Sequence, residues 1–178
     1  MEKEIRNADL SDIMCDLLYL LGCGVNGKIP AKTYIKTFQK VYDEDKMQML
    51  YQFSKIHFVD ALTGTVLKNA GIKILPVWEQ SIAKAIRKVI LFDQERAEIF
   101  SYMDEQGIWH MPLKGVILKG FYPSIGMRQM SDNDILFDKA YAKQIRDYMV
   151  SRGYEVEAFD QGNHDVLSLI HISEPTRP

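Results

Sequence analysis

Apolar residues recur every three or four positions through the N-terminal half of the chain, which is the period of an amphipathic helix. Glycines, a proline and charged residues interrupt this pattern and divide it into helices. Gly22, Gly24 and Gly27 are expected to stop the first helix, Pro30 opens the second, and Asp43 leads into the third. The predicted apolar faces are Ile13, Leu17, Leu18 and Leu21; Tyr34, Phe38 and Val41; and Met47, Leu50, Tyr51, Ser54 and Phe58.

The pattern changes around Asn69-Ala70-Gly71, where this helical region ends. A long helix is predicted from Val77 to about Gln106, and Gly107 ends it. Short apolar runs then alternate with helical spacing. They predict strands over 108–113, 132–137 and 154–159, with helices over 115–121 and 139–151 between them. The chain is therefore predicted to be an α+β protein, with an N-terminal helical region followed by a mixed sheet with flanking helices.

Composition and charge narrow the classes of partner. At 178 residues and 47% hydrophobic content, the chain is long enough to bury a sizeable core. Its formal net charge of -2 gives no basic field, so duplex nucleic acid is not indicated as a partner. No apolar run reaches the ~18 residues that a membrane span needs. Cys15 and Cys23 form no metal-binding pattern and are interpreted as reduced thiols, which predicts a cytoplasmic protein.

Two aspartates separated by one residue are the strongest chemical signal in the chain. On the predicted strand over 132–137, Asp132 and Asp134 would point to the same face, a few ångströms apart. Two carboxylates that close repel each other and are costly beside apolar neighbours unless a cation lies between them. Mg2+ takes oxygen ligands of this kind, so we predict that both aspartates are metal ligands and catalytic residues of phosphoryl or nucleotidyl transfer. The alternative is a strand end whose carboxylates face water.

Residues before the pair supply candidate groups for binding a nucleotide. Gly115 leaves the backbone open at the start of a predicted helix, where free N–H groups can hold phosphates; the alternative is a plain strand-to-helix turn. Lys114 and Arg128 would contribute positive charge, and a guanidinium can bind phosphate oxygens through two hydrogen bonds. Each of these two could equally be a surface residue or a partner of the aspartates. Ser131 is placed to cap or orient the aspartate strand.

The order of these residues is more specific than any one of them. The ordered set comprises Leu113-Lys114-Gly115, Tyr122-Pro123, Arg128 and Asp132-Asn133-Asp134-Ile-Leu-Phe, with helix ends at Asp104-Glu105-Gln106-Gly107-Ile108 and Arg152-Gly153-Tyr154. It resembles the bacterial uncharacterised nucleotidyltransferase-like family, a branch of the polymerase-β-type nucleotidyltransferase superfamily. The resemblance covers residues 95 to 166. It implies a helical region over 1–94 and an incomplete polymerase-β-like palm over 95–166.

The resemblance also implies a reaction. Mg2+ held by Asp132 and Asp134 would support transfer of a nucleoside monophosphate from a nucleoside triphosphate to a hydroxyl acceptor. Family members generally carry a third carboxylate shortly after the region that is Asn163-His164-Asp165 here. This chain departs from the pattern before that residue, because residues 167–178 resemble a translated sequencing-adapter tail. We therefore expect a C-terminally truncated fragment that binds Mg-nucleotide weakly and transfers nothing.

Two matters stay open at the level of the sequence. The acceptor could be a protein hydroxyl, a small molecule or an RNA end, and no residue selects among them. A second hypothesis is a non-catalytic nucleotide-binding or protein-interaction module, in which the palm persists without turnover. A third carboxylate on the next native strand would favour the enzyme, and its absence would favour the module.

Overall fold

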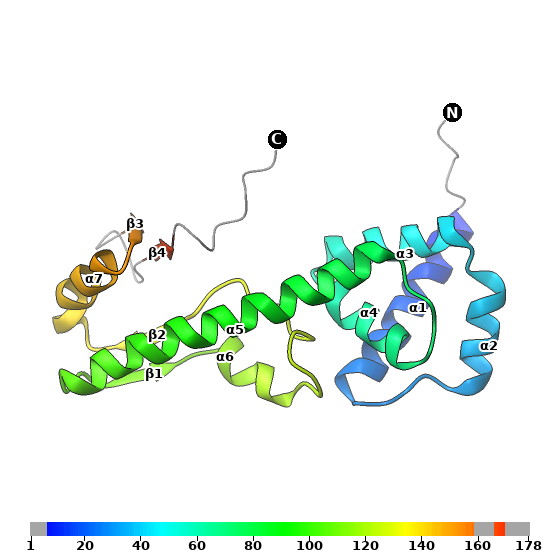
Figure 1. Cartoon of the computed structure of the whole chain (residues 1–178). Helices are drawn as coiled ribbons and strands as arrows, with labels where there is room; N and C mark the ends of the chain where they lie inside the picture. The colour runs from blue at the N-terminus through cyan, green and yellow to red at the C-terminus, as the bar shows by residue number, and fades with distance from the viewer. Residues whose placement is uncertain (1–6, 159–165, 170–178) are drawn as a thin grey trace. The chain divides into compact units, whose positions relative to one another are not determined.

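The computed structural model describes residues 7–158 and 166–169. The fold is α+β, with helices dominant and two small sheets (Figure 1). The elements are α1 (Asn7–Val25), α2 (Lys32–Val41), α3 (Glu44–Ile56), α4 (Asp60–Asn69), α5 (Pro76–Glu105), β1 (His110–Pro112), α6 (Gly115–Leu118), η1 (Lys119–Phe121), β2 (Ile135–Phe137), η2 (Lys139–Tyr141), α7 (Ala142–Ser151), β3 (Tyr154–Ala158) and β4 (Val166–Leu169).

The chain divides into two compact units, and neither is continuous in sequence. The first consists of Met1–Leu91 and Lys114–Asn133, and the second of Phe92–Leu113 and Asp134–Pro178. Helix α5 therefore contributes its N-terminal part to the first unit and its C-terminal part to the second. The division into residues 1–94, 95–166 and 167–178 that the sequence indicates stays a prediction.

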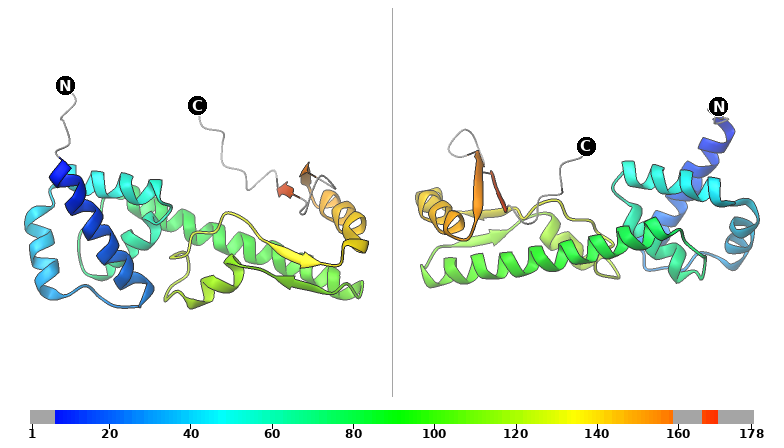
Figure 2. Two further views of the ribbon diagram at one scale, coloured as in Figure 1. Left: turned by 180° about the vertical axis from the view of Figure 1, so that it is seen from behind. Right: turned by 45° about the horizontal axis from the view of Figure 1, so that its top comes forward.

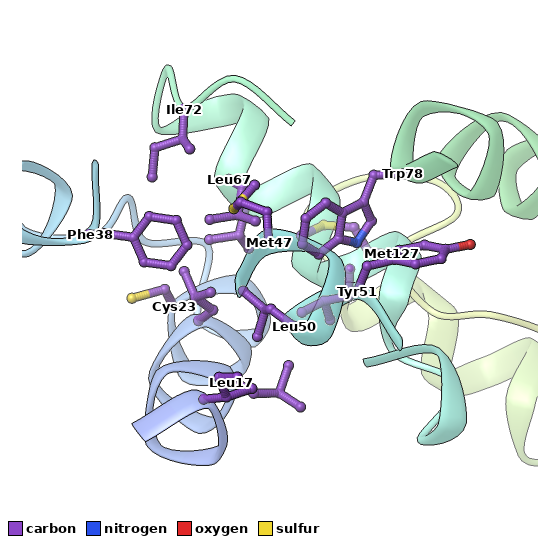
Figure 3. Packing of buried hydrophobic residues seen from close by; sticks show 14 residues of the cluster. Leu17, Cys23, Phe38, Met47, Leu50, Tyr51, Leu67, Ile72, Trp78 and Met127 are labelled. Carbon is purple, nitrogen blue, oxygen red and sulfur yellow. The ribbon is translucent and has the colours of Figure 1, made fainter. Parts of the chain in front are cut away.

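The core of the first unit forms around Trp78, which is fully buried. Tyr51 meets the Trp78 ring edge to face, with centroids 5.5 Å apart, and its hydroxyl lies 3.0 Å from Ser81 Oγ. Met127, which comes from the segment 114–133, belongs to the same buried cluster and lies near Trp78 in Figure 3. Five helices, α1 to α5, and a distant loop segment thus share one apolar core, which accounts for most of the burial that stabilises this unit.

Helix α1 runs to Val25, so the prediction that Gly22 and Gly24 stop it is wrong. Gly24 is retained for packing. A Cβ built there would lie 2.7 Å from Leu62 Cδ2 and 2.8 Å from a methyl carbon of Val66, both on α4. The missing side chain lets the two helices approach closely, which outweighs the weak helix propensity of glycine.

The other helix boundaries follow local sequence signals. The third helix starts after Asp43, as predicted, and Asp43 caps it, because its Oδ1 accepts a hydrogen bond of 2.9 Å from the Lys46 N–H. Helix α5 and its end before Gly107, which has a φ of 65°, are also confirmed. The break between α3 and α4 was not predicted. There Phe58 adopts a φ of 56°, which turns the chain.

One carboxylate joins the first two helices. Asp16 on α1 accepts hydrogen bonds from the hydroxyls of Tyr34 (2.9 Å) and Tyr42 (2.6 Å). Partial burial, reinforced by the hydrogen bond to Asp16, raises the pKa of both tyrosines above the ordinary value. The folded protein therefore holds these two protons more tightly than the unfolded chain does.

The second unit packs two antiparallel strand pairs against helices (Figure 2). Strand β1 pairs with β2 in the register His110↔Phe137, Met111↔Leu136 and Pro112↔Ile135. Ile135 and Phe137 pack on a buried cluster from α5, α7 and the connection between α5 and β1, namely Ile99, Met103, Ile108 and Ile145. The sheet predicted as mixed is present, in the described residues, as two separate antiparallel pairs.

Strand β4 pairs with β3 and was not predicted, because the sequence analysis assigned residues from 167 onward to a tail. The pairing runs from Tyr154↔Leu169 to Ala158↔Val166 and contains a bulge. Residues 159–165 and 170–178 lie outside the described part of the chain, and they include Asn163-His164-Asp165 and most of the predicted tail.

A pair of glycine substitutions tests the packing of α1 on α4. We expect Gly24→Ala to unfold at lower urea concentration than Gly22→Ala, a difference of about 1–3 kcal/mol. The added methyl group gives both variants a similar gain in helix propensity, but a Cβ at Gly22 meets nothing within 4 Å. The fluorescence of buried Trp78 reports unfolding of this unit. Equal stability of the two variants would contradict the close approach.

The tyrosine–Asp16 cluster predicts a loss of stability in alkali. A pKa raised by folding makes a stabilising contribution that is complete below the unfolded value of ~10 and declines as the pH rises above it. The double variant Tyr34→Phe/Tyr42→Phe should show a shallower decline in the free energy of unfolding above pH 10 than the wild type. Tyr141→Phe, which removes an exposed hydroxyl from the second unit, should leave the slope unchanged.

Candidate functional site

The motif residues identified in the sequence lie at the ends of β1 and β2 and in the segment that connects these strands. The N–H of Leu113 donates a hydrogen bond of 2.9 Å to the carbonyl oxygen of Asp134, which extends the β1–β2 ladder by one pair. The chain leaves this pair at Lys114 and returns to it after Asn133. Both ends of the segment 114–133 are therefore fixed by one backbone pairing.

Lys114 begins the turn in an unfavourable conformation. It precedes α6 as the N-cap residue with φ 43° and ψ -104°, and it is exposed. Positive φ is costly for a residue with a Cβ, so the surrounding structure must hold it there. This turn also ends strand β1, because its backbone cannot continue the extended pairing with β2.

Gly115 follows, at a point where a side chain would be in tight contact with Met130. A Cβ built on Gly115 would lie 3.0 Å from Met130 Cε, 3.1 Å from its sulfur and 3.7 Å from Arg128 Nη2. The structure thus brings Gly115 and Arg128 together, although they are separated in sequence. The N–H groups of Ile117 and Leu118 both donate to the Lys114 carbonyl oxygen, at 3.1 and 2.9 Å. Helix α6 is only four residues long, so it supplies little of the helix dipole expected for phosphate binding.

Arg128 is half-buried, and its Nε is buried without a hydrogen-bond partner in the described residues. The same is true of Oε1 of the neighbouring Gln129. Buried polar atoms in folded proteins are nearly always paired, so two unpaired atoms side by side in sequence mark a place where a bound ligand would satisfy them. Arg128 was predicted from the sequence, whereas Gln129 was not, because a single glutamine in a loop carries no pattern.

The aspartates occupy different surroundings. Ser131 and Asp132 are exposed, whereas Asp134 is half-buried. Strand β2 begins at Ile135 and not at Asp132 as predicted, because β1 has ended at Lys114 and offers Asp132 no partner. Asp132 belongs to the first compact unit and Asp134 to the second. Their Cα atoms still lie within ~7 Å of each other, since only Asn133 separates them in the chain.

Within the described residues, no three or more His, Cys, Asp or Glu side chains group closely enough to hold a metal ion by themselves. His110 has structural contacts. Its Nδ1 lies 3.2 Å from the Ile108 carbonyl oxygen and 3.8 Å from Asp104 Oδ1, and its ring lies 4.3 Å from that of Phe100. The candidate metal ligands are therefore the two aspartates alone.

A comparison with protein families gives a match over most of the chain. A family model described as an uncharacterised nucleotidyltransferase matches residues 43–172. The chain belongs to this family. The family assignment made from the ordered motif is confirmed. Searches of curated proteins and of solved structures found no match.

The family match is wider than the motif. It begins near the start of α3, so α3, α4 and all of α5 belong to the matched region together with the motif. It also includes β4, in the first residues of the predicted tail. The function supported at this level is nucleotidyltransferase-like, with a nucleotide as substrate. None of the described helices is long and apolar enough to cross a membrane.

The strained turn at Lys114 gives a stability prediction. Lys114→Gly should be more stable than Lys114→Ala by about 1 kcal/mol or more, because glycine adopts positive φ without the steric cost of a Cβ. Both variants lose the same amine, so their difference isolates the backbone. Urea unfolding would measure it, and a more stable alanine variant would contradict the strained turn.

Proposed function

We propose that this chain binds a nucleoside triphosphate with Mg2+ at Asp132 and Asp134, and that active relatives use the corresponding site to transfer a nucleoside monophosphate to a hydroxyl acceptor. The observation that carries the proposal is the buried, unpaired Nε of Arg128 beside Gly115, at the end of the segment that leads into the two aspartates. A buried guanidinium nitrogen that no protein group satisfies is a suitable donor for a phosphate oxygen.

The residues present fit Mg2+. The donor set consists of carboxylate oxygens, which a hard divalent cation prefers, and Ser131 adds a hydroxyl beside them. Mg2+ at nucleotide sites is typically bound by one or two carboxylates, with substrate phosphates and water completing the coordination. Two aspartates are therefore sufficient protein ligands once a triphosphate is present. When bound, Mg2+ would supply positive charge that neutralises the phosphate oxygens.

The cationic residues would hold the other side of the triphosphate. Arg128 lies next to Gly115, because its Nη2 is 3.7 Å from the position that a Cβ would take there. Lys114 is exposed and would contribute a further positive charge on the preceding residue. In an active relative with the triphosphate held in this way, the acceptor hydroxyl gives its proton to water as its oxygen attacks the α-phosphorus in line, the bond from the α-phosphorus to the bridging oxygen breaks, and pyrophosphate leaves.

A non-catalytic nucleotide-binding or protein-interaction module is the second candidate. It is favoured by the absence, in the described part of the chain, of a third acidic residue grouped with the aspartates. For that reason we expect the chain to bind Mg-nucleotide weakly and to transfer nothing. The acceptor of an active relative could be a protein hydroxyl, a small molecule or an RNA end.

Calorimetric titration tests nucleotide binding directly. In the presence of MgCl2, Asp132→Asn and Asp134→Asn should each weaken binding of ATP by about ten-fold or more, because each removes a charged oxygen ligand of the cation. Asp138→Asn is the matched control. It removes one negative charge at the other end of β2 and keeps an oxygen that can accept from the Ala140 N–H.

Three outcomes separate the hypotheses. Unchanged affinity in both motif variants would refute the metal site. Binding without release of pyrophosphate supports the non-catalytic module. Mg2+-dependent incorporation of labelled nucleotide that disappears in Asp132→Asn would show that the chain is an active enzyme.

A further inference from the structure

The pair β1–β2 has one buried face and one open face. His110, Pro112, Ile135 and Phe137 are half-buried and alternate with Met111 and Leu136, which are 40% and 44% exposed. Met111 and Leu136 are direct cross-strand partners, so they form one apolar patch. Trp109 is two residues before Met111 and is 60% exposed, which places its ring beside the same face.

Asp134 lies on this open face. Alternation along an extended strand puts residues two apart on the same side, and the bond between Leu113 N and the Asp134 carbonyl oxygen shows that the strand geometry reaches Asp134. Asp134 therefore shares a side with Leu136, opposite Ile135 and Phe137, which pack on the buried cluster. The apolar patch is continuous with the position of a candidate metal ligand.

The order of residues along the face matches the chemistry of a nucleotide. Leu113 lies opposite Asp134, and Trp109, the residue just before β1, is four residues back along the chain, which is roughly 13 Å at the rise of an extended strand. Triphosphate at Asp134 would place the sugar over Met111 and Leu136 and the base at the Trp109 ring. The indole has no aromatic or cationic partner among the described residues, so its face is open to stacking.

We propose that Trp109 is the base-stacking residue of this nucleotidyltransferase, with Met111 and Leu136 as the apolar floor under the sugar. This inference rests on the proposed function, because it takes the phosphates to lie at Asp134. Stacking on an aromatic ring tolerates different bases, since each base has a π-face. The site should therefore accept the four common nucleoside triphosphates with small differences in affinity.

Fluorescence can follow this contact, because the chain has two tryptophans in contrasting places. Trp78 is fully buried and Trp109 is exposed, so iodide should quench Trp109 selectively. We expect ATP with MgCl2 to protect Trp109 from iodide. Inorganic tripolyphosphate with MgCl2, which has no base, should bind at the aspartates without protecting it.

Affinity measurements give the second readout. Trp109→Ala should weaken binding of Mg-ATP about ten-fold or more and leave binding of Mg-tripolyphosphate unchanged, whereas Trp109→Phe should keep most of the affinity for ATP. Ile56→Ala, which shortens an exposed apolar side chain on α3, is the control for a general loss of surface hydrophobicity. Circular dichroism would confirm that each variant is folded.

The possible failures are distinguishable. Normal ATP affinity in Trp109→Ala, with Asp134→Asn still defective, would overturn the stacking proposal and leave the proposed function intact. Absence of binding of both ATP and tripolyphosphate would overturn both. Sedimentation that shows a dimer of the wild type and a monomer of Trp109→Ala would assign the face to a second copy of the chain and overturn the proposal.

Discussion

The site depends on one backbone pairing, the hydrogen bond from Leu113 N to the carbonyl oxygen of Asp134. This is the last residue pair between the two strands, because the strained turn at Lys114 prevents a further backbone hydrogen bond. It determines which side of the strand Asp134 occupies, because a shift of one residue would turn every side chain to the opposite face. It also closes the segment that carries Gly115 and Arg128, so the phosphate-binding candidates and the aspartates are parts of a single loop.

The helices of the first unit have a direct role in supporting that loop. Met127 is buried with Trp78 in the main apolar cluster, and Tyr122 packs against the same cluster. Gly126 has φ 85° and approaches α5 so closely that a Cβ would lie 2.7 Å from Ile86 Cγ1 and 3.0 Å from the Ile86 backbone nitrogen. The burial of Met127 and the close contact at Gly126 thus determine the path of the segment 114–133. The family match begins in α3, which agrees with this dependence.

The sequence predicted the parts of the fold that local chemistry decides. The start of α3 after Asp43, the long helix α5 and the end of that helix before Gly107 follow from short-range rules. Gly24 was misinterpreted as a helix stop because its function is to admit Leu62, a residue far away in sequence. The start of β2 was misplaced for a related reason, since the extent of a strand depends on its partner and β1 turns away at Lys114. For the site, the motif named Gly115 and Arg128, but only the fold shows that they meet, and Gln129 gave no signal at all.

The discontinuous composition of the two units has a further consequence. The chain passes from one unit to the other after Leu91, after Leu113 and after Asn133. No uninterrupted stretch of the gene therefore encodes either unit alone, and a single recombination event between relatives would join halves that were never selected together. Both units are thus expected to be inherited and exchanged as one block. The aspartate pair flanks Asn133, after which the chain passes from one unit to the other for the last time.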